Sequence, residues 1–291
     1  MAQSKTDWDS RLVLLAVLPL VAVEAAWQAR NLAAISVAAV IWTLSLSALL
    51  GVVTWKLRAA TPWAAIAGAV ITASLMFSTL APPYDPLHTD LGAVITVFIL
   101  AFAATRLGRS HKQRLGTAER GQGRSAAQVA ANLGVAAIIS SPFARSSLAS
   151  SGWFAHAILA PAILPTAGLA ALTEAAADTV SSEIGQVFGG RPRMITTLRR
   201  VQAGCDGAIS PLGVLAGVSA SATVATAGTL VLGGRANMFL VSTAAGIFGF
   251  LFDSLLGATL EQRGWLKNDA VNFLSTAAAA GLALALMVYL R

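Results

Sequence analysis

Long apolar segments separated by short polar ones constrain the fold of this sequence more than any other feature. A helix that crosses a bilayer needs about 20 apolar residues, and a backbone in lipid must satisfy its own hydrogen bonds, as a helix does. The sequence therefore predicts an all-α polytopic membrane protein, with about nine transmembrane helices in a single membrane domain, 1–291. The predicted segments are 12–29, 32–55, 62–81, 88–106, 125–141, 152–174, 208–232, 237–260 and 270–290.

The composition agrees with a membrane domain and excludes other classes. Charged residues make up 11% of the chain and hydrophobic residues 56%, whereas a soluble domain carries about 25% charged residues. The net charge of +7 does not indicate a nucleic-acid partner, because the basic residues lie in short loops between apolar segments. Cys205 is the one cysteine, so neither an internal disulfide nor a cysteine metal cluster can form.

The basic residues are distributed unevenly between the two sides of the predicted bundle. If the N-terminus is cytoplasmic, the 20 Lys and Arg residues fall on the inner side with four exceptions, Arg30, Arg145, Arg235 and Arg291. Positive residues accumulate in cytoplasmic loops of membrane proteins. The sequence thus predicts a cytoplasmic N-terminus and an outer C-terminus. Short loops and many alanines are typical of a bacterial protein, so we expect a multi-pass protein of the inner (cell) membrane.

Three polar loops lie on the predicted cytoplasmic side, 107–124, 175–207 and 261–269. Most acidic residues outside the N-terminal tail lie in or near these loops. A charge at membrane depth costs at least ~2.5–3.5 kcal/mol, so such residues indicate a cavity or a function. We therefore expect the three loops to form the functional site.

Two carboxylates precede the second of these loops. Glu174 and Asp178 are four residues apart and share one helix face, which Ser182 continues, with Glu183 beside it. Carboxylate and hydroxyl oxygens suit Mg²⁺, which binds one or two carboxylates together with substrate phosphates. The alternative is a helix end that exposes its acids to solvent, and spacing leaves both open.

A basic stretch rich in glycine follows these acids. Gly189, Gly190 and Pro192 end the helix. Glycines expose backbone N–H groups and arginines bind phosphate bidentately, so the stretch favours phosphate binding. The alternative is that the arginines only set the topology. The candidate residues are Arg193, Thr197, Arg199, Gly204, Asp206, Gly207 and Ser210.

Further polar residues lie around the third loop. Asp253 lies near the inner end of an apolar segment, and Glu261 continues its helix face. Asn268 and Asp269 fit the N-cap of the last helix, and capping competes with a binding role for both. Asn272 lies one turn inside an apolar helix, where capping does not explain it.

The first loop, 107–124, carries Lys112 and is followed by Gln128 and Asn132, four residues apart. One interpretation is that the loop attracts anionic lipid, at about 1 kcal/mol per basic residue, while the two amides pack between helices. The other is that the loop is the opposite wall of a phosphate-binding cleft. Separately, Gly213, Gly217 and Ser221 form a stripe of small residues that predicts close helix packing.

Three blocks of the sequence carry a resemblance to a known family. They are KQRLGTAERGQGRSAAQVAANLG at 112–134, ADTVSSEIGQVFGGRPRMITTLRRVQAGCDGAISPLGVLAG at 177–217, and FDSLLGATLEQRGWLKNDAVNFLST at 252–276. The three blocks occur in the same order in an integral-membrane family that includes plant phytyl-phosphate kinase and vertebrate transmembrane protein 19. The chain resembles this family over about residues 60–290. The first block is the weakest match, because paired arginines often precede the QVxAN motif in that family and here Arg124 is followed by Ser125.

The resemblance implies a prenyl-phosphate kinase, which converts a membrane-embedded isoprenoid monophosphate to the diphosphate with a nucleoside triphosphate. The acidic block followed by a basic loop is also similar to dolichol kinase and phosphatidate cytidylyltransferase, which implies CTP as donor and Mg²⁺ as cofactor. The chain contains no Walker A motif, kinase glycine-rich loop or HRD motif.

The resemblance also implies roles for the candidate residues. The expected catalytic residues, which bind Mg²⁺ and the triphosphate or neutralise phosphate charge, are Asp178, Glu183, Asp206 and Lys112. Asp253 and Asp269 are further candidate metal ligands. The residues expected to contact the nucleotide or the substrate are Asn132, Ser182, Arg193, Thr197, Arg199, Gly204, Gly207, Ser210, Asn268 and Asn272.

Two other functions stay open from the sequence. A cytidylyltransferase acting on a lipid phosphate would use the same donor site but attack the α-phosphate. A lipid or isoprenoid transporter would share the apolar bundle, yet it predicts ionisable residues at mid-membrane and paired half-helices. The expected partners are the lipid bilayer, a prenyl phosphate and a nucleoside triphosphate, and the sequence leaves a homodimer open.

Overall fold

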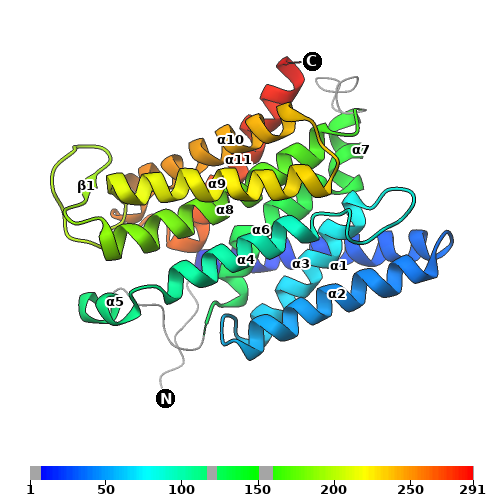
Figure 1. The fold of residues 1–291 in the computed structure, drawn as a ribbon, viewed down its shortest axis with the longest axis horizontal. Helices are drawn as coiled ribbons and strands as arrows, with labels where there is room; N and C mark the ends of the chain where they lie inside the picture. Colours follow the sequence, from blue (N-terminus) through cyan, green and yellow to red (C-terminus); the bar gives the residue numbers. More distant parts are fainter. Residues whose placement is uncertain (1–7, 117–122, 151–159, 291) are drawn as a thin grey trace.

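A computed structural model of the protein describes residues 8–116, 123–150 and 160–290. Its helices form one elongated bundle (Figure 1). The start of the predicted segment 152–174 and part of the predicted loop 107–124 lie outside the described residues. The elements are α1 (Trp8–Ala33), α2 (Val37–Lys56), α3 (Pro62–Thr79), α4 (Leu91–Arg106), α5 (Arg109–Leu115), α6 (Ala126–Ser140), α7 (Pro142–Ser150), α8 (Ile163–Phe188), β1 (Arg193–Met194), β2 (Ala208–Ile209), α9 (Pro211–Val231), α10 (Ala236–Leu256), η1 (Gly257–Glu261) and α11 (Asn268–Tyr289).

The fold is an all-α polytopic membrane fold, as the apolar segments predict. Within the described ranges, six helices are long and apolar enough to cross a membrane, namely α1, α2, α3, α9, α10 with η1, and α11. The pair α6 and α7, bent by 60°, adds a seventh if it counts as one span. Helix α4 is apolar but shorter, and α8 carries three acidic residues. The expected number of nine spans is therefore not confirmed.

Helix α8 lies in the middle of the bundle and forms its core. It packs against α4, α6, α9, α10 and α11, and nearly every residue from Ile163 to Val180 is buried. Alanine, glycine and threonine fill much of this stretch, so neighbouring helices approach it on all sides. Large apolar side chains such as Trp42 and Leu215 instead face outward, where lipid would surround them.

The small-residue stripe of α9 packs closely against α8, as predicted. A Cβ atom added at Gly213 would lie 2.7 Å from the backbone oxygen of Ser181, and one at Gly217 would lie 3.0 Å from that of Ala177. The hydroxyl of Ser221 donates to the backbone oxygen of Thr243 on α10. The stripe thus joins α8, α9 and α10 at short backbone distances.

The two ends of the bundle carry different elements. The start of α1 is fixed to the start of α11, because Asp9 Oδ2 accepts from Lys267 N at 2.6 Å and Ser10 Oγ donates to Asp269 Oδ2 at 2.6 Å. The α5 helix and the β1–β2 hairpin lie at one end of the bundle, and α7 and the C-terminus lie at the other (Figure 1). The start of α1 and the C-terminus therefore lie at opposite ends, consistent with the expected topology.

The predicted cytoplasmic loops contain more regular structure than expected. Helix α8 continues to Phe188, so the loop predicted over 175–207 begins only after it. The remaining segment is held by β1 and β2, which pair antiparallel with Arg193 opposite Ile209. Loop 107–124 contains α5, and loop 261–269 begins at the end of η1 and ends inside α11.

The predicted N-cap of the last helix is wrong. The N-cap of α11 is Lys267, which makes no side-chain capping hydrogen bond. Asn268 and Asp269 are instead the first helical residues. The physical reason is that the Asp269 carboxylate accepts from Ser10 of α1, a tertiary contact that no local pattern contains.

We expect Gly213→Ala to destabilise the bundle, because the added methyl group would overlap the α8 backbone, and overpacking of this kind costs about 1–3 kcal/mol. Gly281→Ala is the matched control, since a Cβ atom there meets nothing within 4 Å and alanine favours a helix. Thermal unfolding of the two variants in detergent, followed by tryptophan fluorescence, measures the difference. Equal midpoints would contradict the close packing of α8 and α9.

Candidate functional site

A polar cavity of about 860 Å³, part of it open to solvent, lies at the end of the bundle that carries β1 and β2. Its wall comes from the second half of α8, the segment before α9, the end of α10 with η1, and the first residue of α11. Eight residues that the sequence predicted for the site line it together. They are Asp178, Ser182, Gly204, Asp206, Gly207, Ser210, Asp253 and Asn268.

Glycine permits the close contacts that shape this wall. Gly207 has a φ of +75°, and a Cβ atom there would lie 2.4 Å from the backbone nitrogen of Ala258 in η1. The hydroxyl of Ser210 accepts from Gly213 N as the N-cap of α9, and a Cβ atom at Gly189 would lie 2.4 Å from that hydroxyl oxygen. The loop thereby lies directly on η1 and on the end of α8.

Four carboxylates from four elements line the cavity. They are Asp178 of α8, Asp206 of the loop, Asp253 of α10 and Glu261 of η1. The Asp253 carboxylate is fixed by a neighbouring helix, because Ser275 Oγ of α11 donates to Asp253 Oδ2 at 3.1 Å. Such a cluster of partly buried acids is a favourable setting for a cation or a cationic complex.

Among the carboxylates of the cavity wall, Asp206 lies in a loop outside the membrane-spanning helices. Burial raises the pKa of its carboxyl group above the ordinary aspartate value, and the nearby ammonium group of Lys267 partly opposes that rise. Asp206 therefore exchanges a proton at a higher pH than an exposed aspartate does.

No group of three His, Cys, Asp or Glu side chains among the described residues is arranged to hold a metal ion by itself. The five expected metal ligands, Asp178, Glu183, Asp206, Asp253 and Asp269, are not all on the cavity wall. Glu183 binds Lys112, and Asp269 binds Ser10. The remaining aspartates are hard oxygen donors, which fits Mg²⁺ because this ion takes few carboxylates and fills its other positions with water and phosphate oxygens.

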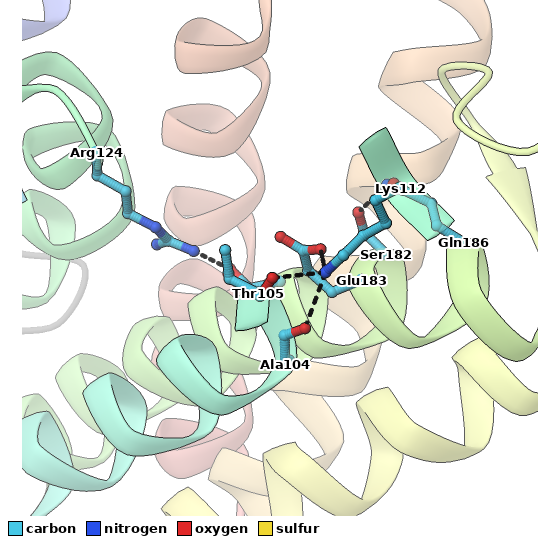
Figure 2. A network of polar contacts seen from close by, with 8 residues as sticks. Ala104, Thr105, Lys112, Arg124, Ser182, Glu183 and Gln186 are labelled. Atoms are coloured by element: carbon cyan, nitrogen blue, oxygen red, sulfur yellow. Dashed lines mark hydrogen bonds and ion pairs between the residues drawn. The ribbon is translucent and has the colours of Figure 1, made fainter. Parts of the chain in front are cut away.

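Lys112 is buried, with 1% of its surface exposed. Its Nζ donates to the backbone oxygens of Ala104 at 3.0 Å and Thr105 at 2.7 Å, and to Glu183 Oε2 at 2.5 Å (Figure 2). The ammonium group thereby ties the C-terminal end of α4 to α8. Neither Lys112 nor Glu183 lines the polar cavity, and their pairing joins two helices beside it.

The residues expected from the β1–β2 segment are only partly brought to the cavity. Arg193 donates to the backbone oxygen of Leu198 at 2.8 Å, and Thr197 accepts from Arg199 N. Arg193, Thr197 and Arg199 are not on the cavity wall.

A chain of amides leads away from the polar cavity. With the Asn272 amide turned so that both its ends are satisfied, its nitrogen donates to Asp253 Oδ2 at 3.2 Å and to Asn268 O at 3.1 Å. Its oxygen accepts from Asn132 Nδ2 at 3.1 Å. Neither Asn132 nor Asn272 lines the polar cavity. Their hydrogen bonds instead connect Asp253, on the cavity wall, to α6.

A second cavity of about 920 Å³ lies on the other side of this amide chain. Residues of α2, α3, α4 and α6 form most of its wall, which is largely apolar. Arg58, Arg106, Arg124 and Asn132 lie among its lining residues. The guanidinium group of Arg124 also donates to Thr179 Oγ1 on α8 at 3.2 Å.

The sequence patterns predict neither this second cavity nor several of the residues that line the polar cavity. Glu261 shares the helix face of Asp253, a signal that could have added it to the ligand set, and η1 is a π-helix, a distortion often found at functional sites. No local pattern indicates the apolar cavity, because its wall comes from separate helices. The other unpredicted residues of the polar wall include Ser181, Gln186, Cys205 and Ser254.

Comparison with known proteins defines the class to which this fold and site belong. The family model described as integral membrane protein DUF92 matches residues 45–280. The chain therefore belongs to this family of integral membrane proteins, which confirms the family indicated by the three sequence blocks. No solved structure matches the chain.

Individual relatives come from archaea, cyanobacteria and plants. An uncharacterized membrane protein of Methanocaldococcus jannaschii is 42% identical over 108 residues, which cover 37% of this chain and 45% of that one. An uncharacterized membrane protein of Synechocystis is 30% identical over 197 residues, 66% of this chain and 71% of that one. The chloroplastic protein VTE6 of Arabidopsis thaliana is 30% identical over 186 residues, 62% of this chain and 54% of that one. The chain thus spans about half the length of the first and third.

The contact between Lys112 and Glu183 yields a test. Lys112→Met leaves the Glu183 carboxylate without its cation, and breaking a buried pair in this way costs about 3–5 kcal/mol. The double variant Lys112→Met with Glu183→Met removes both charges, so we expect it to be more stable than Lys112→Met alone. Unfolding in detergent measures each variant, and Arg114→Met, an exposed residue of the same short helix, is the control. If the losses in free energy of unfolding of the two single variants add up to that of the double variant, the pairing is contradicted.

Proposed function

We propose that this protein is a prenyl-phosphate kinase that uses CTP and Mg²⁺ at the inner face of the membrane. The observation that carries the proposal is the polar cavity, where aspartates from α8, α10 and a glycine-rich loop face one space at one end of the bundle. Support comes from the sequence blocks 177–217 and 252–276, which contribute these aspartates and glycines and resemble the family that includes plant phytyl-phosphate kinase.

The cavity wall contains the groups that a triphosphate requires. One or two of the carboxylates of Asp178, Asp206 and Asp253 would hold Mg²⁺ together with phosphate oxygens of the nucleotide, and the ion would supply positive charge that offsets the phosphates. Gly204 and Gly207, both with positive φ, are in a loop where backbone N–H groups can bind phosphate oxygens. Ser182 and Asn268 supply further polar side chains on the same wall.

Phosphoryl transfer is mostly a matter of position and charge. An oxygen of the prenyl monophosphate attacks the γ-phosphorus of CTP, the bond from that phosphorus to the β-phosphate oxygen breaks, and CDP leaves. The attacking oxygen is already anionic, so no general base has to remove a proton. The protein therefore has to align two anions and offset their charge. The acids of the polar cavity would serve the metal, and Arg124, which donates to Thr179 beside Asp178, supplies a positive charge close to them.

The direct test is turnover by the purified full chain with geranylgeranyl phosphate, CTP and Mg²⁺. We expect geranylgeranyl diphosphate and CDP as products, and Asp178→Asn or Asp206→Asn to lower the rate about 100-fold or more, as loss of one charge-stabilising group does. Asp85→Asn, in the loop between α3 and α4 away from the cavity, is the matched control and should retain the rate. Unchanged activity in both cavity variants would contradict the site.

Product analysis separates the proposal from its alternatives. Release of pyrophosphate with a CDP-linked lipid would indicate cytidylyl transfer at the same donor site. Absence of any turnover, together with movement of prenyl phosphate across vesicle membranes, would indicate a transporter. Replacing CTP by ATP, GTP or UTP in the same assay tests the donor base.

The pKa of Asp206 gives a pH dependence. The deprotonated carboxylate binds the metal, and burial raises the pKa, so the metal-binding form is lost as the pH falls and this loss begins at a higher pH than for an exposed aspartate. We expect the Mg²⁺ affinity measured by nucleotide binding to weaken as the pH falls, with a loss that begins at a higher pH than an exposed aspartate would give. Asp206→Asn should make this dependence shallower, whereas equal pH profiles for the variant and the native protein would exclude Asp206 as a ligand.

A further inference from the structure

We propose that the apolar cavity between α2, α3, α4 and α6 binds a single-chain lipid monophosphate, with the phosphate at its arginines and the chain between its helices. This assignment rests on the proposed function for the chemical class of the ligand, and it adds the place where the acceptor binds. The bound molecule enters from the bilayer, and its head group faces α8.

The wall of the cavity has two chemically distinct parts. Its longer part is apolar and includes Leu50, Val94, Val97, Phe98 and Leu133. Val94 and Arg106 are both lining residues of α4 and are twelve residues apart, so this part extends about 18 Å along the helix. An extended hydrocarbon chain fits a wall of this length and composition.

The polar part of the cavity is cationic. Arg58, Arg106 and Arg124 are among the lining residues, and none of the described lining residues is acidic. The Arg106 guanidinium lies over the Phe102 ring at 4.6 Å and donates to the backbone oxygen of Leu57 at 2.7 Å, which holds it at the ends of α2 and α4. Guanidinium groups bind phosphate bidentately, so this end complements a monoester phosphate.

The backbone supports the position of this cationic end. Arg124 N donates to Ala59 O at 2.9 Å, and Thr61 N donates to Arg124 O at 3.0 Å. These hydrogen bonds fix the segment before α6 to the turn between α2 and α3, which contains Arg58. The relative position of the arginines is therefore set by main-chain contacts between segments far apart in the sequence.

Helix α8 separates the two cavities and brings their polar ends together. Ala175 lines the apolar cavity, whereas Asp178, on the next turn, lines the polar one. Arg124 donates to Thr179, the residue after Asp178, and the amides of Asn132 and Asn272 connect to Asp253. A phosphate held by the arginines thus lies next to the acids that would hold the nucleotide, as transfer between two anions requires.

The lateral route into the cavity follows from the packing of its helices. Helix α2 packs mainly against α3 and α1, whereas α4 packs mainly against α8 and α9. The two helices that border this route are therefore held by different neighbours and can separate without losing those contacts. A lipid with one chain can enter between them without leaving the bilayer.

Photolabelling tests the assignment without nucleotide or turnover. The full chain in nanodiscs is exposed to an alkyl phosphate with a diazirine in its tail, and mass spectrometry locates the label. We expect label on α2, α3, α4 and α6, and competition by dodecyl phosphate. Label confined to other helices would overturn the proposal, even if the kinase assay succeeds.

Variants separate recognition of the chain from recognition of the phosphate. Gly68→Leu fills the cavity, since a Cβ atom there meets only Val129 Cγ1 at 3.7 Å, and should lower labelling about tenfold, in line with the loss of a buried apolar contact. Arg58→Gln with Arg106→Gln should lower it by a similar factor through lost charge-assisted hydrogen bonds. Arg30→Gln, an exposed residue of α1, is the control and should change nothing. Unaltered labelling in all variants would overturn the site.

Two further probes identify the ligand chemistry. A photoreactive alkyl alcohol with the same tail should label weakly and should not respond to the arginine variants, because it lacks the phosphate. If inorganic phosphate displaces the probe as well as dodecyl phosphate does, the chain contributes nothing and the lipid assignment is wrong. Correct labelling without kinase turnover would instead reject the proposed reaction and retain the lipid phosphate site.

Discussion

The burial of α8 in the middle of the bundle is the constraint on which the other features of the structure depend. Its first half is covered on all sides, so its small residues set how closely α4, α6, α9, α10 and α11 approach. The same helix carries Glu174, Asp178 and Glu183 toward one end of the bundle. Because charges are costly in a dry interior, the positions of Asp178 and Glu183 require a cavity, a cation or a polar partner from the surrounding helices.

The neighbours of α8 meet this requirement in different ways on its different sides. On the side of α4, Lys112 pairs with Glu183 and binds two backbone oxygens. On the side of α10 and α11, Asp178 and Asp253 face the polar cavity. On the side of α6, Arg124 binds Thr179 and lines the apolar cavity. A single helix thus lies between a wall suited to a metal-bound triphosphate and one suited to a lipid phosphate.

The local pattern predicted much of the polar wall, and the reason is periodicity. Asp178 and Ser182 are one turn apart and do share a face, and the glycines of the following segment do shape a loop over the cavity. Glu183 is adjacent to Ser182 in sequence but points to Lys112. Arg193 donates to the backbone oxygen of Leu198 within its own hairpin, and neither Arg193 nor Arg199 lines the cavity. Spacing indicates which residues share a face, but it does not indicate what that face meets.

The class of this protein follows from its amino-acid sequence, because local composition specifies membrane helices and charge specifies the loops between them. The sequence also identifies the family, through three ordered blocks, and most of the acids on the polar wall. Three features became visible only in the folded bundle. Lys112 joins α4 to α8, Asn132 meets Asn272 across 140 residues of sequence, and arginines from separate segments line one cavity. These features depend on which helices pack against each other. That packing is set by the fit of whole helix faces from distant parts of the chain, which no short stretch of sequence encodes.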